Sequence, residues 1–514
     1  MNRNLLPGLL LTLSALLAGG CAVNPVTGKS ELAWISEEQE ISLGEQMYVP
    51  MQQMQGGRYD IDPELTEYVQ GVAGRLAEVS DRALPYEFVV LNSSVPNAWA
   101  LPGGKIAINR GLMTELESES ELAAVLGHEI VHAAARHSAK AQERSTWLQL
   151  GTITAAVATG GSGYGNQAVG AANLGAQIVS QTYGRGAELE SDLYGMRYMS
   201  AAGYDPQGAV TLQQTFVRLS EGNSQDWVSG LFSSHPPSQA RVDANIATAT
   251  GLPAGGATGA ERYRAAMAKT IAAKPAYDAY DEGRKALKDG DIDVANQKAE
   301  QAIGMLPEEA NFHALRGDAR FESEQYKSAV SNYDSAIHRR DDYFYYYVQR
   351  GRALEELGND AAAHNDLQKS VELLPTGLAY LSLGNLAAKK GNPAEAIGHY
   401  KKVAGGDGEL ALAARTELVR LDISGNPGEY LQFRCDPDSS GELIVSVKNA
   451  TPLVVRGVSF VIDFTDSVGR PRRIERQIGR PLKPGEIARV GTGIAPYPAG
   501  SACPVRISAA RVAE

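Results

Sequence analysis

A regular period of small residues in the second half of the chain constrains its fold more than any other feature of the 514-residue sequence. Glycines recur 34, 34 and 33 residues apart, at Gly283, Gly317, Gly351 and Gly384. An alanine follows each glycine after twelve residues, at Ala295, Ala329, Ala363 and Ala396. Small residues at such a period mark where paired helices approach closely. We therefore expect residues 275–410 to form an all-α solenoid of stacked helix pairs.

This period is typical of the tetratricopeptide repeat, for which about three units suffice for stability. Pro307 and Pro375 fall at repeat ends, where a helix must stop. The aromatic run Tyr343–Tyr347 suits either core packing or a concave binding surface. Repeats of this kind usually hold another protein, which is an inference from fold alone.

The segment His128-Glu129-Ile130-Val131-His132 points to a specific chemistry. It lies within residues 121–140, whose composition favours a helix, so the two histidines share one helical face. Two imidazoles aimed at one point suit zinc, and Glu129 can act as the general base on a water held there. We therefore predict a site for a single Zn²⁺ ion. Two ordinary helix histidines are the alternative.

A catalytic zinc keeps three protein ligands and one open position, so a third ligand is needed. The best candidate segment is Glu188-Leu189-Glu190-Ser191-Asp192. Glu188 and Asp192 share a helix face at spacing i and i+4, whereas Glu190 points elsewhere. Glu188 can reach the metal while Asp192 orients one of the ligating histidines. An acidic, solvated helix start is the other interpretation.

Four segments together carry a family resemblance: His128–His132, Glu188–Asp192, Gly203–Pro206, and Ser234–Ser238 with Arg241. They resemble the HtpX-like zinc metalloproteases, and the repeats make the chain most similar to the periplasmic BepA-like branch of that family. The resemblance implies an α+β, zincin-like metalloprotease domain over residues 21–255, with Glu188 as the third zinc ligand. Ser191 stands where the family usually has alanine, and both residues are small.

The resemblance also draws attention to His235, which precedes two prolines. In the family the matching loop lies over the active site, where its histidine approaches the zinc and shuts the site, or contacts substrate. Neutral imidazole is a metal ligand and imidazolium can stabilise an oxyanion, so both roles are chemically sound. Arg241 either holds this loop or stabilises developing charge. We take Glu129, His235 and Arg241 as candidate catalytic residues; an ordinary loop histidine is the alternative for His235.

His137 is a weaker candidate. On a continuous helix it lies nine residues from His128, which turns it about 180° away at about 100° per residue. We therefore expect it to cap or pack the helix end, together with Arg136, rather than to bind the same metal.

A peptide substrate needs its own binding surface, and three strands are expected before the histidine helix, at 87–91, 97–101 and 105–109. An extended peptide can add to a free sheet edge through main-chain hydrogen bonds. The candidate edge strand consists of Asn97, Ala98, Trp99 and Ala100. An ordinary hairpin strand explains the same pattern.

The N-terminus predicts export. Residues 1–20 contain the mostly apolar run Leu5–Leu17, which is too short for a comfortable membrane span. The sequence Leu17-Ala18-Gly19-Gly20-Cys21 at their junction with the rest of the chain resembles a bacterial lipoprotein signal with Cys21 as the lipidated residue. Ala22, rather than aspartate, implies the outer membrane in an enterobacterial-type sorting system. An ordinary signal peptide with a free Cys21 is the alternative.

The C-terminal segment, residues 428–514, alternates apolar and polar residues in short runs, which predicts a small β-sandwich-like domain. It contains Cys435 and Cys503, and an exported protein meets an oxidising compartment. We predict a disulfide between them. Two buried thiols remain the alternative, because spacing cannot show that they meet.

Charge and composition exclude some partners. The net charge of −12 argues against nucleic acid and leaves no basic patch for a membrane surface. Leu148–Gln181 is rich in glycine and alanine. It suits either a lid close to the active site or a low-complexity loop, with membrane insertion as a minor alternative.

These features predict a multidomain zinc endopeptidase of the periplasm, anchored to the outer membrane through Cys21. Its substrates are expected to be unfolded or misassembled envelope proteins. The resemblance implies that the repeats select them near the outer-membrane barrel-assembly machinery. The rival interpretation is a chaperone or assembly scaffold whose protease site is latent and closed by His235. Substituting Glu129 separates the two, because only a protease then loses its function.

Overall fold

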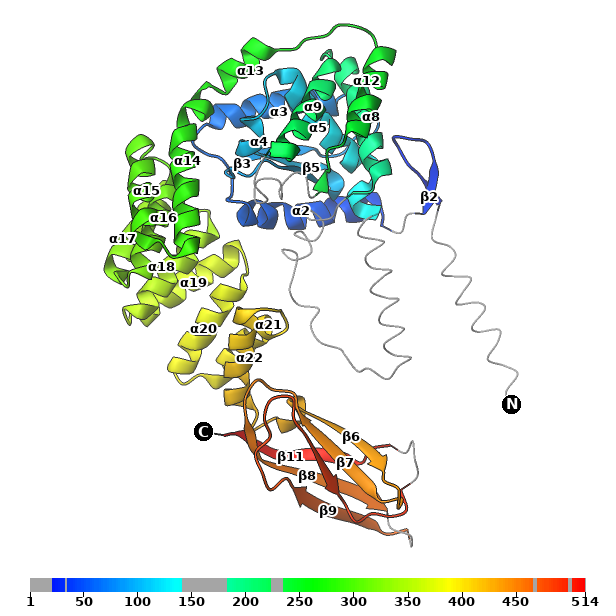
Figure 1. Ribbon diagram of the computed structural model, residues 1–514, viewed down its shortest axis with the longest axis vertical. Coiled ribbons are helices and arrows are strands. Elements are labelled where there is room, and N and C mark those ends of the chain that lie inside the picture. Colours follow the sequence, from blue (N-terminus) through cyan, green and yellow to red (C-terminus); the bar gives the residue numbers. More distant parts are fainter. Residues whose placement is uncertain are drawn as a thin grey trace, which may run out of the picture. The chain divides into compact units, whose positions relative to one another are not determined.

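The structure is a computed structural model that describes residues 21–32, 35–140, 183–222, 234–465, 469–497 and 502–513. It divides into two compact units, residues 1–346 and 347–514 (Figure 1). The predicted signal peptide and the candidate lid at 148–181 lie outside the described residues. Within the described ranges, no helix combines the length and the apolar character that a membrane crossing requires.

A mixed three-stranded sheet organises the first unit. It contains β3 (Glu87–Leu91), β4 (Ala98–Leu101) and β5 (Lys105–Asn109) in the order β3-β5-β4, and β5 runs parallel to β3 and antiparallel to β4. The predicted strands at 87–91 and 105–109 are confirmed, and the third begins one residue late. The candidate edge strand therefore does lie at an edge of this sheet.

Alternation along the strands divides the core into two layers, because successive side chains point to opposite faces. Val90, Ile106 and Ile108 join the larger core beneath α3 (Pro63–Ala77) and α5 (Glu119–Ala134). Val89, Leu91 and Trp99 pack instead with α2 (Glu37–Met54). Figure 1 shows α2 on one side of the sheet and the other helices of this domain on the opposite side.

The histidine helix α5 is buried along its whole length, which accounts for its apolar composition. Around it and the sheet lie β1 (Cys21–Val23), β2 (Ser30–Leu32), η1 (Pro102–Gly104), α4 (Arg110–Met113), α8 (Arg185–Ala201), α9 (Gln207–Gly222), α12 (Gln239–Gly251) and α13 (Ala260–Ala266). Ser118 caps α5 by accepting a hydrogen bond from the Glu121 amide.

The predicted helical repeats are present. They comprise α14 (Ala268–Asp289), α15 (Ile292–Met305), α16 (Ala310–Glu322), α17 (Tyr326–Arg339), α18 (Phe344–Glu356), α19 (Asp360–Leu373), α20 (Gly377–Lys389), α21 (Pro393–Ala404) and α22 (Glu409–Asp422). A Cβ atom on Gly317 would lie 2.6 Å from the Tyr333 ring, and one on Gly384 would lie 2.4 Å from the Tyr400 ring. The periodic glycines are therefore where the helices leave no room for a side chain.

Within the first unit, the first repeats pack directly on the sheet domain. Glu309 accepts hydrogen bonds from Asn92 Nδ2 at 2.9 Å and from the Tyr277 hydroxyl at 2.5 Å, and all three side chains are buried. Gln53 Nε2 donates to the Asp342 carbonyl at 2.6 Å. A buried hydrogen bond keeps its geometry because breaking it leaves a buried polar group unpaired, which costs free energy. The first repeats are therefore fixed against the domain that carries the histidine helix.

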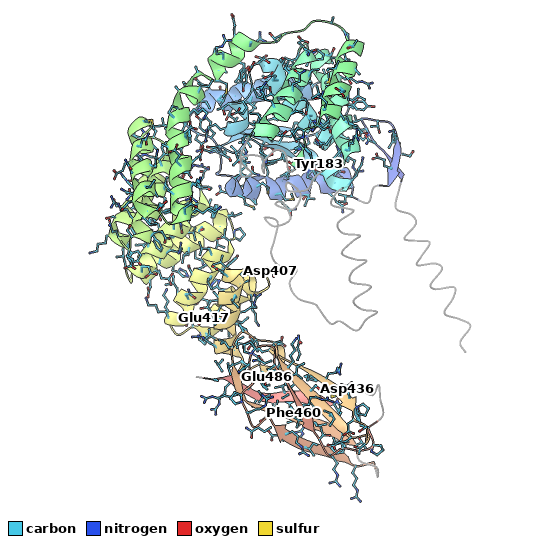
Figure 2. All side chains as sticks on the ribbon, viewed as in Figure 1. Tyr183, Asp407, Glu417, Asp436, Phe460 and Glu486 are labelled. Carbon is cyan, nitrogen blue, oxygen red and sulfur yellow. A yellow bond between two sulfur atoms is a disulfide. The ribbon has the colours of Figure 1, made fainter. Side chains whose placement is uncertain are left out.

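The C-terminal strands form two antiparallel three-stranded sheets, β10-β7-β6 and β11-β8-β9, preceded by η2 (Pro427–Glu429). Their bounds are β6 (Leu431–Pro437), β7 (Leu443–Asn449), β8 (Val455–Thr465), β9 (Pro471–Gln477), β10 (Ile487–Gly491) and β11 (Val505–Val512). The sheets share one core, in which Phe460 is fully buried (Figure 2). Cys435 on β6 and Cys503, just before β11, are joined as a disulfide. The predicted fold class is confirmed in all three parts.

Candidate active site

A close contact between two helices brings the candidate metal ligands together. Gly127 on α5 faces Gly195 on α8, and a Cβ atom on Gly195 would lie 3.0 Å from the His128 amide nitrogen. Without side chains at these two positions the helix backbones approach each other closely. Asp192 and Glu188, about one and two turns before Gly195, consequently face the histidines of α5.

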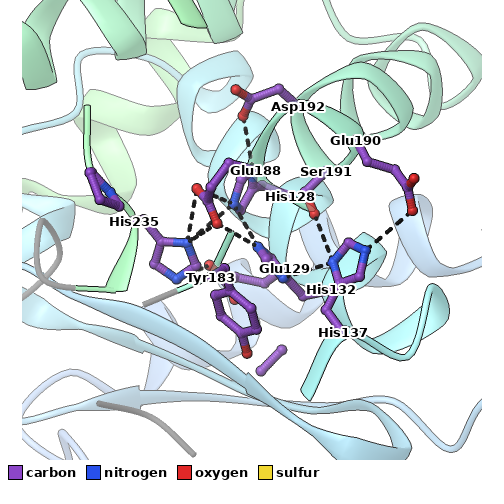
Figure 3. Close-up of polar contacts among 12 residues, drawn as sticks. His128, Glu129, His132, His137, Tyr183, Glu188, Glu190, Ser191, Asp192 and His235 are labelled. Carbon is purple, nitrogen blue, oxygen red and sulfur yellow. Dashed lines mark hydrogen bonds and ion pairs between the residues drawn. The ribbon is translucent and has the colours of Figure 1, made fainter. Parts of the chain in front are cut away.

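Four buried side chains converge on one point: His128, His132, Glu188 and His235. Each offers one ligand atom, and these four atoms lie within 4.8 Å of one another (Figure 3). Glu188 Oε2 lies 3.5 Å from His128 Nε2, and Glu188 Oε1 lies 3.3 Å from His132 Nε2. The three residues predicted as zinc ligands are thus gathered in one place, and His235 joins them through Nδ1, 3.1 Å from Glu188 Oε1.

The outward nitrogens of both α5 histidines have partners, which sets their tautomers. His128 Nδ1 lies 2.9 Å from Asp192 Oδ1, and a carboxylate only accepts. His132 Nδ1 lies 3.0 Å from His137 Nδ1, whose other nitrogen lies 3.2 Å from Glu190 Oε1. If Glu190 accepts a hydrogen bond from His137 Nε2, then Nδ1 of neutral His137 carries a lone pair. This lone pair accepts a hydrogen bond from His132 Nδ1. Both α5 histidines are thereby left with an Nε2 lone pair that points inward.

This arrangement fits a metal ion. The two Nε2 atoms are only 2.9 Å apart, with the Glu188 carboxylate beside them. Two lone pairs and a carboxylate facing one another repel unless a cation lies between them. Burial alone would lower the pKa of His128, but the Glu188 and Asp192 carboxylates raise it above its ordinary value, which shows that this position favours a positive charge. Imidazole and carboxylate ligands suit zinc, and the orienting contacts are those that ligating histidines usually have.

Arg241 pairs with both carboxylates of α8 at the cluster, Asp192 and Glu188. Its Nε and Nη2 atoms lie 2.7 Å from the two Asp192 oxygens, and its Nη1 lies 2.8 Å from Glu188 Oε2. Burial works to raise the pKa of Asp192, but the guanidinium holds it below its usual value. Arg241 therefore keeps both carboxylates charged and in place. Arg241 Nη1 also donates a hydrogen bond to the Pro236 carbonyl at 3.4 Å, so Arg241 contacts the loop that carries His235 as well.

Glu129 lies beside the cluster, as a general base requires. Its Oε1 atom lies 3.6 Å from His235 Nε2. Its Oε2 atom is buried and has no hydrogen-bond partner among the described residues. Burial raises the pKa of this carboxyl above its ordinary value, which makes it a better proton acceptor.

Tyr183 belongs to the site although no spacing rule pointed to it. Its ring centre lies 4.1 Å from that of His132, and its hydroxyl lies 2.7 Å from Ser138 Oγ. Ser138 in turn donates to the Ala100 carbonyl at 3.0 Å, on the candidate edge strand. Burial raises the pKa of Tyr183, so the phenol stays protonated. The only signal for Tyr183 in the sequence was an aromatic residue just before Gly184, which did not by itself indicate a role in the site.

His137 does not lie on a continuation of the histidine helix, contrary to the prediction of a helix that runs to residue 140. The helix α5 ends at Ala134, and Arg136 adopts a left-handed conformation with φ of 64°. Arg136 pairs with Glu40, which holds this uncommon backbone state in place. The chain turns back, and His137 reaches His132. It is not one of the four converging ligands, but it orients one of them, together with Glu190.

We expect His137→Ala to weaken Zn²⁺ binding about 10- to 100-fold, because removing a partner that orients a ligating histidine has effects of this size. Glu190→Gln should give a smaller loss in the same direction. Affinity is measured by competition with a chromophoric chelator. The exposed His338 on α17 provides a matched control, since His338→Ala removes an imidazole far from the site in sequence. Equal zinc affinity in all the variants would contradict the relay from Glu190 to His132.

Comparisons with known proteins agree with this geometry. Residues 62–248 match the model of peptidase family M48, and residues 280–344 and 348–411 match the tetratricopeptide repeat. The "Beta-barrel assembly-enhancing protease" of Yersinia pestis is 34% identical over 37% of this chain and 40% of its own length. The protein of the same name from Escherichia coli K12 is 30% identical over 42% of this chain and 45% of its own.

The match extends beyond that group. The "Mitochondrial metalloendopeptidase OMA1" of Arabidopsis thaliana is 29% identical over 32% of each chain. A solved tetratricopeptide repeat protein from Thermus thermophilus is 18% identical, with a TM-score of 0.26, over 31% of this chain and 90% of that one. The chain thus spans less than half the length of the first relatives it matches. Residues 62–248 are thus similar to peptidase family M48, and residues 280–411 contain two stretches similar to tetratricopeptide repeats.

Proposed function

We propose that the protein is a zinc-dependent endopeptidase that hydrolyses unfolded or misassembled proteins of the bacterial envelope. The observation that carries this proposal is the buried cluster of His128, His132, Glu188 and His235, with the unpartnered Glu129 Oε2 beside it among the described residues. Leaving a buried carboxylate oxygen without a partner lowers the stability of the fold. Its place beside a cluster of metal ligands is therefore better explained by a catalytic role. The names of the matched relatives support the same activity and a role near outer-membrane barrel assembly.

The chain's own residues supply the proton transfers. Zinc, when bound by His128, His132 and Glu188, would act as the Lewis acid that activates water and polarises the scissile carbonyl. Glu129 takes the proton of the attacking water on Oε2 and later delivers it to the leaving amine. Asp192 and His137 hold the two ligating rings in orientation, and Arg241 keeps Asp192 and Glu188 charged. The edge strand β4 would pair with an extended peptide beside them.

We also propose a location and partners for the protein. The N-terminal segment up to Cys21 resembles a lipoprotein signal, which supports anchoring of the protein to the outer membrane on the periplasmic side. The repeats, the first of which pack on the M48 domain, would bring clients or the barrel-assembly machinery close to the cluster. Membrane fractionation of the native chain beside Cys21→Ser tests the anchor. Release of only the variant would support it, and equal distribution of both would oppose it.

The position of His235 supports a second candidate function. A zinc with four protein ligands has no open position and is typical of structural sites. His235 offers its Nδ1 atom within the same cluster, so the described state would be closed. In this state the protein would act as a chaperone or scaffold until the loop around His235 moves.

We expect His235→Ala to raise the hydrolysis of casein about tenfold, with bound zinc unchanged. If closure is favoured by about 1.4 kcal/mol, then about a tenth of the molecules are open, and removing the closing ligand frees the rest. Initial rates are measured beside metal content. A fall of about 100-fold would instead assign His235 to the stabilisation of the oxyanion.

A further inference from the structure

The net charge of the whole chain conceals an opposite charge in its C-terminal strands. From the first residue of β6 to the last residue of β11, residues 431–512 contain twelve basic and seven acidic residues, a net charge of +5. Because the whole chain carries −12, the remaining residues carry −17. A cationic domain attracts anionic surfaces even when the protein as a whole is acidic. The overall charge of −12 therefore does not exclude a basic surface on these strands.

Most of this positive charge lies on and around β9, an edge strand of the sheet β11-β8-β9 (Figure 1). Residues 470–480 contain five arginines and one acidic residue, Glu475. These five arginines, called the arginine edge below, are Arg470, Arg472, Arg473, Arg476 and Arg480. Four of them are exposed, and Arg476 is half-buried. Side chains alternate between the two faces of a strand, but on an edge strand those of both faces can reach past the same margin of the sheet.

Two ion pairs among the described residues offset part of this charge. Arg473 Nε lies 2.6 Å from Asp463 Oδ1, and Arg480 pairs with Glu486. Arg476 instead donates to the main-chain carbonyl of Thr492 at 2.5 Å, which leaves its positive charge in place. Like charges on neighbouring residues repel one another, which lowers stability unless an anion is bound among them.

The kind of cation indicates the kind of anion that fits. Ten of the twelve basic residues at 431–512 are arginine, whereas the rest of the chain has 22 arginines and 14 lysines. The planar guanidinium group binds a phosphate through two parallel hydrogen bonds, which an ammonium group does not provide. The composition of these strands therefore favours a partner that presents phosphate groups.

The place of these arginines on an edge strand favours a lipid surface over a protein strand. An extended acidic peptide would pair with β9 through main-chain hydrogen bonds. Charged side chains along an edge oppose such pairing, and Pro471 has no N–H to donate. A membrane surface needs no main-chain contact and presents many anionic groups at once. An edge that is guarded against another strand is therefore still open to anionic headgroups.

We propose that the arginine edge binds the phosphate headgroups of an anionic phospholipid membrane. This inference goes beyond the proposed function, because it depends on neither the peptidase activity nor a lipid anchor at Cys21. It gives the C-terminal strands a role of their own, which is contact with a membrane surface.

The test measures binding to sucrose-loaded vesicles by sedimentation, with the protein prepared from Ala22 onward so that no lipid anchor contributes. Vesicles of phosphatidylcholine alone are compared with vesicles in which phosphatidylglycerol makes up about a third of the lipid. We expect binding to the anionic vesicles only. Salt at about 1 M should abolish it, because the Debye length then falls to about 3 Å.

A double variant removes two exposed charges from the arginine edge. Arg470→Gln with Arg472→Gln should lower the affinity for anionic vesicles about 30-fold, since each cation near an anionic leaflet contributes about fivefold. The matched control is Arg264→Gln with Arg420→Gln, which removes the same charge from exposed positions on α13 and α22. This control should bind as the unsubstituted protein does. Hydrogen exchange at β8 checks that the strands remain folded in both double variants.

The other outcomes each overturn the proposal. An equal loss of affinity in the two double variants would assign the binding to net charge rather than to the arginine edge. Binding to both kinds of vesicle alike would show that anionic headgroups are not what the protein recognises. Fluorescent poly-glutamate tests the competing partner, and tighter binding to it than to the anionic vesicles would point to an acidic protein. If nothing binds, the arginines serve only to guard the edge of the sheet against other strands. Hydrolysis of casein should be equal in both double variants, so a failure of the proposed peptidase function leaves this test intact.

Discussion

Glu129→Gln should lower the hydrolysis of an unfolded protein such as casein about 10²- to 10⁴-fold while leaving bound zinc unchanged. The substitution keeps the size of the side chain and removes only its capacity to accept a proton. In the structure this carboxylate lies beside the four converging ligands, and its Oε2 atom has no other partner among the described residues. The four converging ligand atoms belong to other residues, and the substitution removes a buried charge. The rate should therefore fall with no change in metal content and no fall in melting temperature.

The matched control is Glu45→Gln, an identical change at an exposed position on α2. Chelation should stop the unsubstituted protein and the control alike. If Glu129→Gln cuts as well as the unsubstituted protein, then Glu129 is not the general base. If all forms are inert although zinc is bound, the closed state with His235 as a ligand gains support.

Loss of the disulfide between Cys435 and Cys503 should lower the free energy of unfolding of the C-terminal sheets by about 4 kcal/mol. The bond closes a loop with a sequence separation of 68 residues, and in the chain-entropy model a loop of this length restricts the unfolded chain to this extent. It also ties β6 of one sheet to the segment that leads into β11 of the other. Without it, the two sheets are held together by their shared core and by hydrogen bonds such as that from Arg476 Nη2 to the Thr492 carbonyl.

Hydrogen exchange at β7 and β8 measures this effect, because their amides report opening of the sheets in the full chain. Cys435→Ser and Cys503→Ser should accelerate exchange there to the same degree, and the double variant should add nothing further. Peptide hydrolysis should be unchanged, since the cluster lies in the other unit. Equal protection with and without the bond would show that it is dispensable for stability.

Local patterns in the sequence predicted the parts of this protein whose contacts are local. His128 and His132 share a face because the spacing of four residues acts within one helix. The repeat period and the two strands at 87–91 and 105–109 likewise follow from short patterns. The disulfide, whose cysteines are 68 residues apart, was expected only because export was predicted. The spacing of Glu188 and Asp192 made Glu188 a candidate ligand and the family resemblance supported it, whereas His235 was singled out by the resemblance.

Contacts between distant segments were decided only by tertiary packing. His137 orients His132 because α5 stops at Ala134 and Arg136 turns the chain, and a helical spacing rule cannot anticipate where a helix ends. Glu190, expected to point elsewhere, meets His137 for the same reason. Glu188 and Asp192 face the histidines because Gly127 and Gly195 let α5 and α8 approach closely. The sequence alone determined which residues can do this chemistry. The tertiary structure decided which of them meet, because burial and backbone turns act between segments that no local pattern connects.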